Sequence, residues 1–153
     1  MRRLFIPLIA FQLLALAVSA PAATGKIIKV LPHFLDAQGR DSKSPSLYDR
    51  DAYQAWLRRH PEACSGIRYD VQWKAREATG TLKLRLELRG IAQGSLPRQK
   101  TIETEIKPSH GLSRWNGVGL TGDDYKAFGE VTAWRVTLWD GDTMLAEQKS
   151  FLW

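Results

Sequence analysis

Cysteine is almost absent from this chain of 153 residues, and histidine and methionine are scarce. One cysteine, three histidines and two methionines occur. A single thiol cannot close a disulfide within the chain, and one cysteine is too few for a zinc site built on thiolates. The sequence therefore excludes both a disulfide-stapled scaffold and a zinc finger.

Motifs that carry catalysis are also missing. The chain has no Gly-x-Ser-x-Gly elbow for a nucleophilic serine and no glycine-rich loop for phosphate. His60 and Cys64 lie close along the chain, but Pro61 between them breaks the helical spacing that would join a base to a nucleophile. The remaining histidines, His33 and His110, are not spaced along the chain in the way that metal ligands are. We therefore expect a protein that is not an enzyme and that holds no cofactor and no metal.

Carboxylates offer the only alternative to that expectation. Glu103 and Glu105 share one face of a predicted strand, but glycoside hydrolysis needs its two acids across a cleft at a defined separation. A small hydrolase would have to take Glu103, Asp123 or His110 from separate elements. Calcium in the acidic loop of residues 36–51 is a further alternative, although that loop has no EF-hand ligand spacing.

The only long apolar run of the chain lies at its N-terminus. Two arginines follow Met1, residues 4–18 are almost wholly apolar, and small residues occupy the positions before a cleavage point after Ala22. The run is shorter than the roughly 20 residues that a helix needs to cross a bilayer. We expect residues 1–22 to be a signal peptide and residues 23–153 to form one extracytoplasmic domain, periplasmic or secreted. An uncleaved anchor is the alternative.

Positive charge is in modest excess. Lysine and arginine number 22 against 16 acidic residues, which gives a formal net charge of +6. An exported chain rarely meets nucleic acid, and the basic residues are spread along the chain instead of clustered. We expect a solvated basic surface and no nucleic-acid partner. The candidate partners are an acidic polysaccharide or another protein of the cell envelope, and the mature chain is not expected to be embedded in the membrane.

Alternation of apolar and polar residues predicts that most of the mature chain forms strands. Five apolar side chains alternate with polar ones over residues 67–76, and four leucines alternate with charged residues over residues 82–89. Further strands are expected at 26–35, 99–107, 113–120, 131–139 and 143–152.

Two hairpins follow from these strands. Pairing the strands 67–76 and 82–89 with Asp70 opposite Arg85 and Arg68 opposite Glu87 would match opposite charges, which favours that register. Alternatively, the two strands lie in opposite sheets and the charge match is accidental.

The second hairpin is predicted by the Asp-Gly-Asp turn of residues 140–142 between two apolar runs. A three-residue loop would set Arg135 opposite Glu147 and Leu138 opposite Met144.

One helix is expected near residues 47–60. Ser46 or Asp49 can cap its start, and Pro61 ends it. Cys64, just beyond, is expected to pack as a small buried hydrophobe, with oxidation or an intermolecular bridge as the alternative. The packing face of the helix is predicted to comprise Ala52, Tyr53, Trp56 and Leu57.

Seven short strands and one inserted helix predict an antiparallel, immunoglobulin-like β-sandwich in which the helix covers an edge or an end of a sheet. Residues 129–153, which include Trp134-Arg135-Val136-Thr137-Leu138-Trp139 before the Asp-Gly turn, resemble the last hairpin of immunoglobulin-like or fibronectin-III-like bacterial domains. The resemblance covers about 25 residues. It implies an architecture and no particular activity.

Six tryptophans are many for a domain of this size. Trp73 and Trp56 are expected to pack inward. Trp115 in a glycine-rich stretch, Trp139 at the hairpin turn and Trp153 are the candidates for a ligand or partner surface. We expect a non-catalytic binding or structural module of the bacterial cell envelope or secreted space. The alternative is a carbohydrate-binding module whose exposed tryptophans stack on sugar rings.

Overall fold

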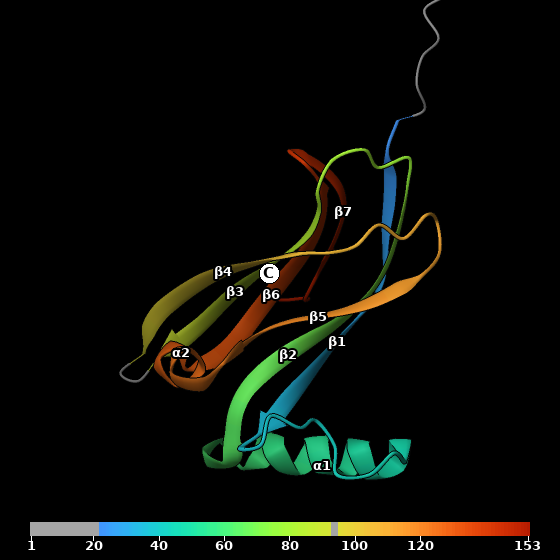
Figure 1. The fold of residues 1–153 in the computed structure, drawn as a ribbon. Helices are drawn as coiled ribbons and strands as arrows, with labels where there is room; N and C mark the ends of the chain where they lie inside the picture. Colours follow the sequence, from blue (N-terminus) through green and yellow to red (C-terminus); the bar gives the residue numbers. More distant parts are fainter. Residues whose placement is uncertain (1–21, 93–94) are drawn as a thin grey trace, which may run out of the picture.

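The structure, a computed structural model, describes residues 22–92 and 95–153 and consists of two antiparallel sheets packed face to face (Figure 1). Sheet A has the strand order β1 (Thr24–Asp36), β2 (Cys64–Arg76) and β5 (Arg114–Thr121). Sheet B has the order β4 (Leu96–Glu105), β3 (Leu82–Ala92), β6 (Glu130–Asp140) and β7 (Thr143–Lys149). The predicted seven-stranded antiparallel β-sandwich is confirmed. The predicted signal peptide lies outside the described residues except for Ala22.

Two helices accompany the strands, α1 (Leu47–Arg59) and α2 (Gly122–Phe128), together with a short 3-10 helix, η1 (Pro61–Ala63). The hydroxyl of Ser46 accepts a hydrogen bond from the Asp49 N–H, so the predicted cap of α1 is confirmed. The helix α2 was not predicted, because seven residues are too few to show a helical period. Asp123 lies in its first turn, where a carboxylate is favourable to the helix dipole.

The facing sides of the two sheets form the core. Successive side chains of a strand point to opposite faces, so the alternating strands β2 and β3 each bury one row and expose the other. Tyr69, Val71 and Trp73 of β2 are almost completely buried. Leu82, Leu84, Leu86 and Leu88 of β3 are each at most 2% exposed, which confirms the inward face that their spacing predicts.

The predicted hairpin between β2 and β3 is wrong. β2 pairs with β1 and β5, whereas β3 pairs with β4 and β6, so the two strands lie in opposite sheets. Asp70, expected opposite Arg85, accepts hydrogen bonds from Arg68 of its own strand. Arg85 binds Glu103 of β4, and Glu87 binds an arginine of β6. Each charge thus finds a partner on its own sheet, and charge matching could not identify the neighbouring strand.

The hairpin of β6 and β7 is confirmed, but its predicted register is wrong. The turn has two residues, 141–142, and a bulge interrupts the ladder between Leu138 and Trp139. A bulge sets two residues against one, which shifts every pair beyond it. Arg135 still reaches Glu147 across the ladder, with 3.5 Å between Nη1 and Oε2. The expected pairs Arg135–Glu147 and Leu138–Met144 are replaced by Arg135–Lys149 and Leu138–Ala146.

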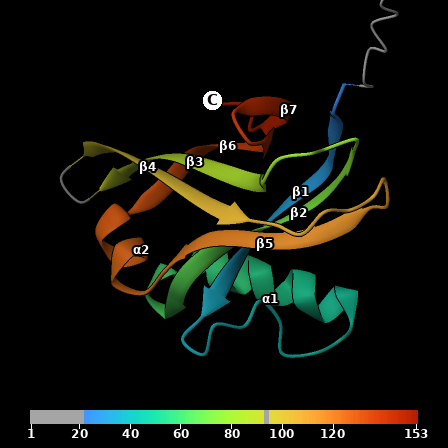
Figure 2. The same cartoon turned by 45° about the horizontal axis from the view of Figure 1, so that its top comes forward.

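The side chain of Gln54 fastens α1 to the free edge of β1. Its Oε1 accepts from the Phe34 N–H at 2.8 Å and its Nε2 donates to the Phe34 carbonyl at 2.9 Å, so the amide pairs with the backbone as a neighbouring strand would. This contact sets α1 across one end of sheet A, as Figures 1 and 2 both show.

The packing face of α1 differs from the predicted one. Gln54 and Leu57 are buried, whereas Trp56 is 39% exposed and stacks between Tyr53 and His60. The prediction ranked positions by apolar character. The edge of β1 at Phe34 instead requires both an acceptor and a donor, which the amide of Gln54 supplies, whereas an indole has only a donor.

Candidate functional site

The three tryptophans predicted as a ligand surface do not share one face of the sandwich. Trp139 is on the outer face of sheet B, where the Arg85 guanidinium lies 4.4 Å from its ring centre. The Arg89 guanidinium lies 4.1 Å from the ring centre of Trp153. Trp115 is the cross-strand neighbour of Gln72 on the outer face of sheet A and is 50% exposed. The structure therefore does not bring the three together, and Trp115 stands apart from the two that arginines cover.

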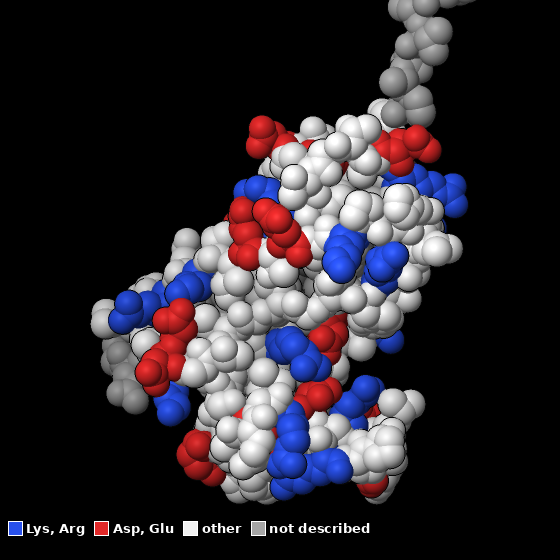
Figure 3. All heavy atoms as spheres, in the orientation of Figure 1, with Lys and Arg blue, Asp and Glu red and all other residues white. Residues whose placement is uncertain are grey.

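A cleft runs between α1 and the outer face of sheet A, and Trp115 lines it. Figure 3 shows a hollow between α1 and the strands above it, with acidic and basic side chains around it. The cleft has a volume of about 380 Å³. Its lining residues are Leu31, His33, Arg50, Asp70, Trp115, Asn116 and Gly117.

Strand register explains the floor of this cleft. Leu31 pairs with Asp70, and Asp70 pairs with Gly117, so the three form one row across the outer face of sheet A. Gly117 contributes no side chain, and a Cβ there would lie 3.0 Å from Cδ of Arg68. The glycine therefore keeps the sheet surface open beside Trp115.

An ion-paired network fixes the carboxylate at the centre of the row. Asp70 accepts from Arg68 Nε at 2.8 Å and from Arg68 Nη2 at 2.9 Å, and His33 Nδ1 lies 2.8 Å from its Oδ2. Burial by itself would raise the pKa of Asp70, but the hydrogen bonds from Arg68 and His33 outweigh it and lower the pKa. Asp70 is thus a rigid, ionised hydrogen-bond acceptor in the cleft.

His33, Asp41 and Asp70 are close enough to resemble a metal site. Their ligand atoms all lie within 4.8 Å of one another. However, Arg68 pairs with both carboxylates, at 2.8 Å to Asp70 and 3.5 Å to Asp41. A guanidinium bound to the same oxygens opposes a second cation, so the arrangement favours an ion-pair network over metal binding.

Arg50 adds positive charge to the α1 side of the cleft. Its Nε is buried and has no hydrogen-bond partner among the described residues. Buried donors in folded proteins are nearly always satisfied, and an exception calls for a specific explanation. Because Nε is shielded from solvent, a ligand in the open cleft does not reach it, and Arg50 lines the cleft through its other atoms.

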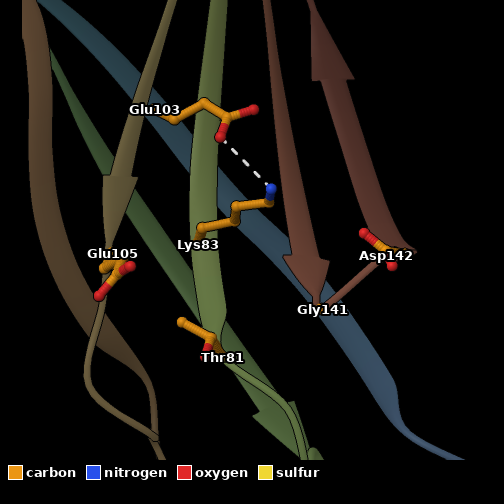
Figure 4. Close-up of a pocket in the computed structure, with 6 residues that line it drawn as sticks. All are labelled: Thr81, Lys83, Glu103, Glu105, Gly141 and Asp142. Carbon is orange, nitrogen blue, oxygen red and sulfur yellow. Dashed lines mark hydrogen bonds and ion pairs between the residues drawn. The ribbon is translucent and has the colours of Figure 1, made fainter.

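A second hollow at the edge of sheet B contains the acidic pair considered for hydrolysis. Glu103 is bound by Lys83 at 3.3 Å and by Arg85 at 2.6 Å, and these hydrogen bonds lower its pKa. A general acid needs a raised pKa. Neither Asp123 nor His110 lines this hollow, so the described residues do not assemble the acids of a hydrolase there. The lining residues are Thr81, Lys83, Glu103, Glu105, Gly141 and Asp142 (Figure 4).

Cys64 is buried at the start of β2, with its Sγ 3.4 Å from the carbonyl oxygen of Leu57. The predicted packing as a small hydrophobe near a helix end is confirmed. Burial raises the pKa of the thiol, and a hydrogen bond with Tyr125 offsets this only in part.

We therefore expect the Cys64 thiol of the folded protein to react with iodoacetamide at least about tenfold more slowly than glutathione at the same pH, because the thiolate is the reactive form. In denaturant the two rates should agree. Mass spectrometry of timed samples measures both rates. A folded-state rate equal to that of glutathione would contradict the burial of the thiol.

Comparison of the chain with known protein families, with curated proteins and with solved structures gives no match. None of the described helices is long and apolar enough to span a membrane. The function proposed below therefore rests on the geometry of the chain and on its N-terminal sequence.

Proposed function

We propose that this protein is an exported, non-catalytic binding module of the bacterial cell envelope or secreted space that binds carbohydrate in the cleft on sheet A. The observation that carries the proposal is the half-exposed indole of Trp115, held on a strand beside polar groups that line the same cleft. Ligand sites in proteins combine aromatic side chains with a few well-placed polar groups. A sugar ring matches both, because its C–H face stacks on an indole while its hydroxyls bind the polar groups.

The polar groups around Trp115 have fixed positions. Asp70 and His33 are hydrogen-bonded to each other, and Asp70 is also held by the Arg68 guanidinium. Sites on strands whose side chains are locked by further contacts keep their geometry better than sites on loops. This rigidity supports recognition of a ring of defined shape.

The fold supports the proposed resemblance to immunoglobulin-like or fibronectin-III-like domains. The chain crosses from sheet A to sheet B between β2 and β3, returns between β4 and β5, and crosses again between β5 and β6. Such crossings are typical of Greek-key sandwiches. Because that architecture hosts many functions, it supports the fold resemblance and leaves the binding role to the cleft.

Replacing Trp115 with alanine tests the proposal. We expect the wild-type protein to bind one or more envelope polysaccharides on a glycan array, and W115A to bind them about 30-fold more weakly, which corresponds to roughly 2 kcal/mol for an aromatic anchor. Isothermal titration with the best oligosaccharide from the array measures the loss.

W139A is the matched control, because it removes an indole from the outer face of sheet B. We expect its affinity to stay within about twofold of the wild type, and circular dichroism checks that both variants fold. Unchanged binding by W115A, or a wild-type protein that binds no polysaccharide on the array, would overturn the proposed function.

A further inference from the structure

The two outer faces of the sandwich differ in whether their basic side chains have an ion-pair or aromatic partner. Each basic side chain that β3 and β6 project from sheet B has a partner, since Lys83 and Arg85 bind Glu103, Arg135 binds Glu87 and Arg89 lies on Trp153. On sheet A, three lysines of β1 and β2 form no ion pair with any described acid. These lysines, named here the lysine row, are Lys26, Lys29 and Lys74.

The lysine row lies on the same face as Trp115. Lys26 is directly opposite Lys74, Lys29 is opposite Gln72, and Gln72 is in turn opposite Trp115. Like charges directly across a ladder are destabilising. Folding alone therefore gives no reason for the pair Lys26 and Lys74, whereas an anionic ligand would relieve their repulsion.

A hollow of about 240 Å³ lies at this end of sheet A and is lined by Lys26, Lys74 and Arg76, among others. The cleft with Trp115 lies further along the same strands. Lys26 and His33 are seven residues apart on β1, which corresponds to roughly 23 Å at about 3.3 Å per residue. The outer face of sheet A thus offers an extended basic track that leads into the cleft.

The cleft itself contains a donor suited to an anion. Arg50 lines the cleft, and a guanidinium binds a carboxylate through strong charge-assisted hydrogen bonds. This donor is independent of the lysine row, because it comes from α1 and not from the sheet.

We infer that the ligand of this face is an acidic polysaccharide whose sugars carry carboxylates, such as a polymer of uronic acids. The inference rests on the proposed carbohydrate-binding function. One sugar stacks on Trp115, its carboxylate accepts from Arg50, and carboxylates further along the chain neutralise the lysine row.

Polygalacturonate and its fully methyl-esterified form make a matched pair of probes, because they share a backbone and differ in charge. We expect the wild-type protein to bind polygalacturonate at least about tenfold more tightly than the ester at low salt, with the difference shrinking as salt is added. Equal affinity for the two would overturn the inference and leave carbohydrate binding intact. Binding of neither, together with a blank glycan array, would overturn the proposed function as well.

Charge-neutral variants locate the effect. We expect K26Q/K74Q and R50Q each to lose about tenfold in affinity for polygalacturonate, and K26Q/K74Q, which lies outside the cleft, to keep the wild-type affinity for the ester. K83Q/K149Q is the control, since it removes the same charge from the outer face of sheet B, and it should bind both probes as the wild type does.

Two outcomes of these measurements would overturn the acidic-polysaccharide assignment. One is an equal loss in K83Q/K149Q, which would show that net charge alone governs binding. The other is binding of single-stranded DNA as tightly as polygalacturonate, which would show a general affinity for polyanions. Circular dichroism and thermal unfolding confirm that each variant is folded.

Discussion

Replacing Trp73 with alanine is expected to lower the free energy of unfolding by roughly 3–5 kcal/mol. The Trp73 side chain is fully buried between the two sheets, so its removal leaves a cavity that the neighbouring strands cannot fill. The substitution also removes the hydrogen bond of 2.9 Å that the indole N–H of Trp73 donates to Oδ1 of Asn116. Urea unfolding followed by circular dichroism measures the change without relying on tryptophan fluorescence.

A loss of this size is a large fraction of the roughly 5–15 kcal/mol that stabilises a typical domain, so W73A can fail to fold. W73F, which keeps most of the ring volume, is the second variant and should cost about 1–3 kcal/mol. W139A is the control, because a half-buried indole under Arg85 should contribute only about 1 kcal/mol. Equal losses in W73A and W139A would contradict the central position of Trp73 in the core.

Strand positions were predictable from the sequence because burial on one side of a sheet is a local pattern. The alternating segments around Tyr69 and Leu86 fold as β2 and β3 with their apolar sides buried. Strand neighbours were not predictable in the same way. Charge matching gave Asp70 a partner in β3, but an arginine two positions away on its own strand satisfies the carboxylate equally well. Many registers offer such matches, so charge does not identify the neighbouring strand.

The candidate site was predictable at one residue only. Trp115 stands out in the sequence as a large aromatic residue in a glycine-rich stretch, and the structure places it at a cleft. His33, Arg50 and Asp70 come from a strand, a helix and another strand, and nothing in their spacing shows that they meet. Gly117, a glycine of that stretch, keeps the floor of the cleft open beside Trp115.

Asp36, at the end of β1, holds the loop that leads to the cleft. Its carboxylate accepts from the N–H groups of Gln38 and Arg40, from the Arg40 guanidinium and from the Tyr53 hydroxyl of α1. Burial by itself would raise the pKa of this carboxyl, but the four hydrogen bonds outweigh it and lower the pKa from 3.8 to about 2. The ionised carboxylate therefore joins the loop after β1 and, through Tyr53, the helix α1 to the end of the strand.

We expect D36N to lose about 2 kcal/mol of unfolding free energy at neutral pH, because the folded state lowers the pKa of Asp36 from 3.8 to about 2. A lowered pKa stabilises the folded state above the unfolded value, and that stabilisation is lost as the pH falls from roughly 4 to 2. The stabilities of the wild type and D36N should therefore converge in this range. Urea unfolding between neutral pH and pH 2 measures both curves.

D142N is the matched control for this experiment, since Asp142 is exposed at the turn between β6 and β7. We expect it to follow the wild type at every pH. If D36N instead ran parallel to the wild type down to pH 2, the loss at neutral pH would come from packing and not from ionisation. The acid sensitivity would then have to arise from other carboxylates with lowered pKa values, of which Asp70 in the cleft is the first to test.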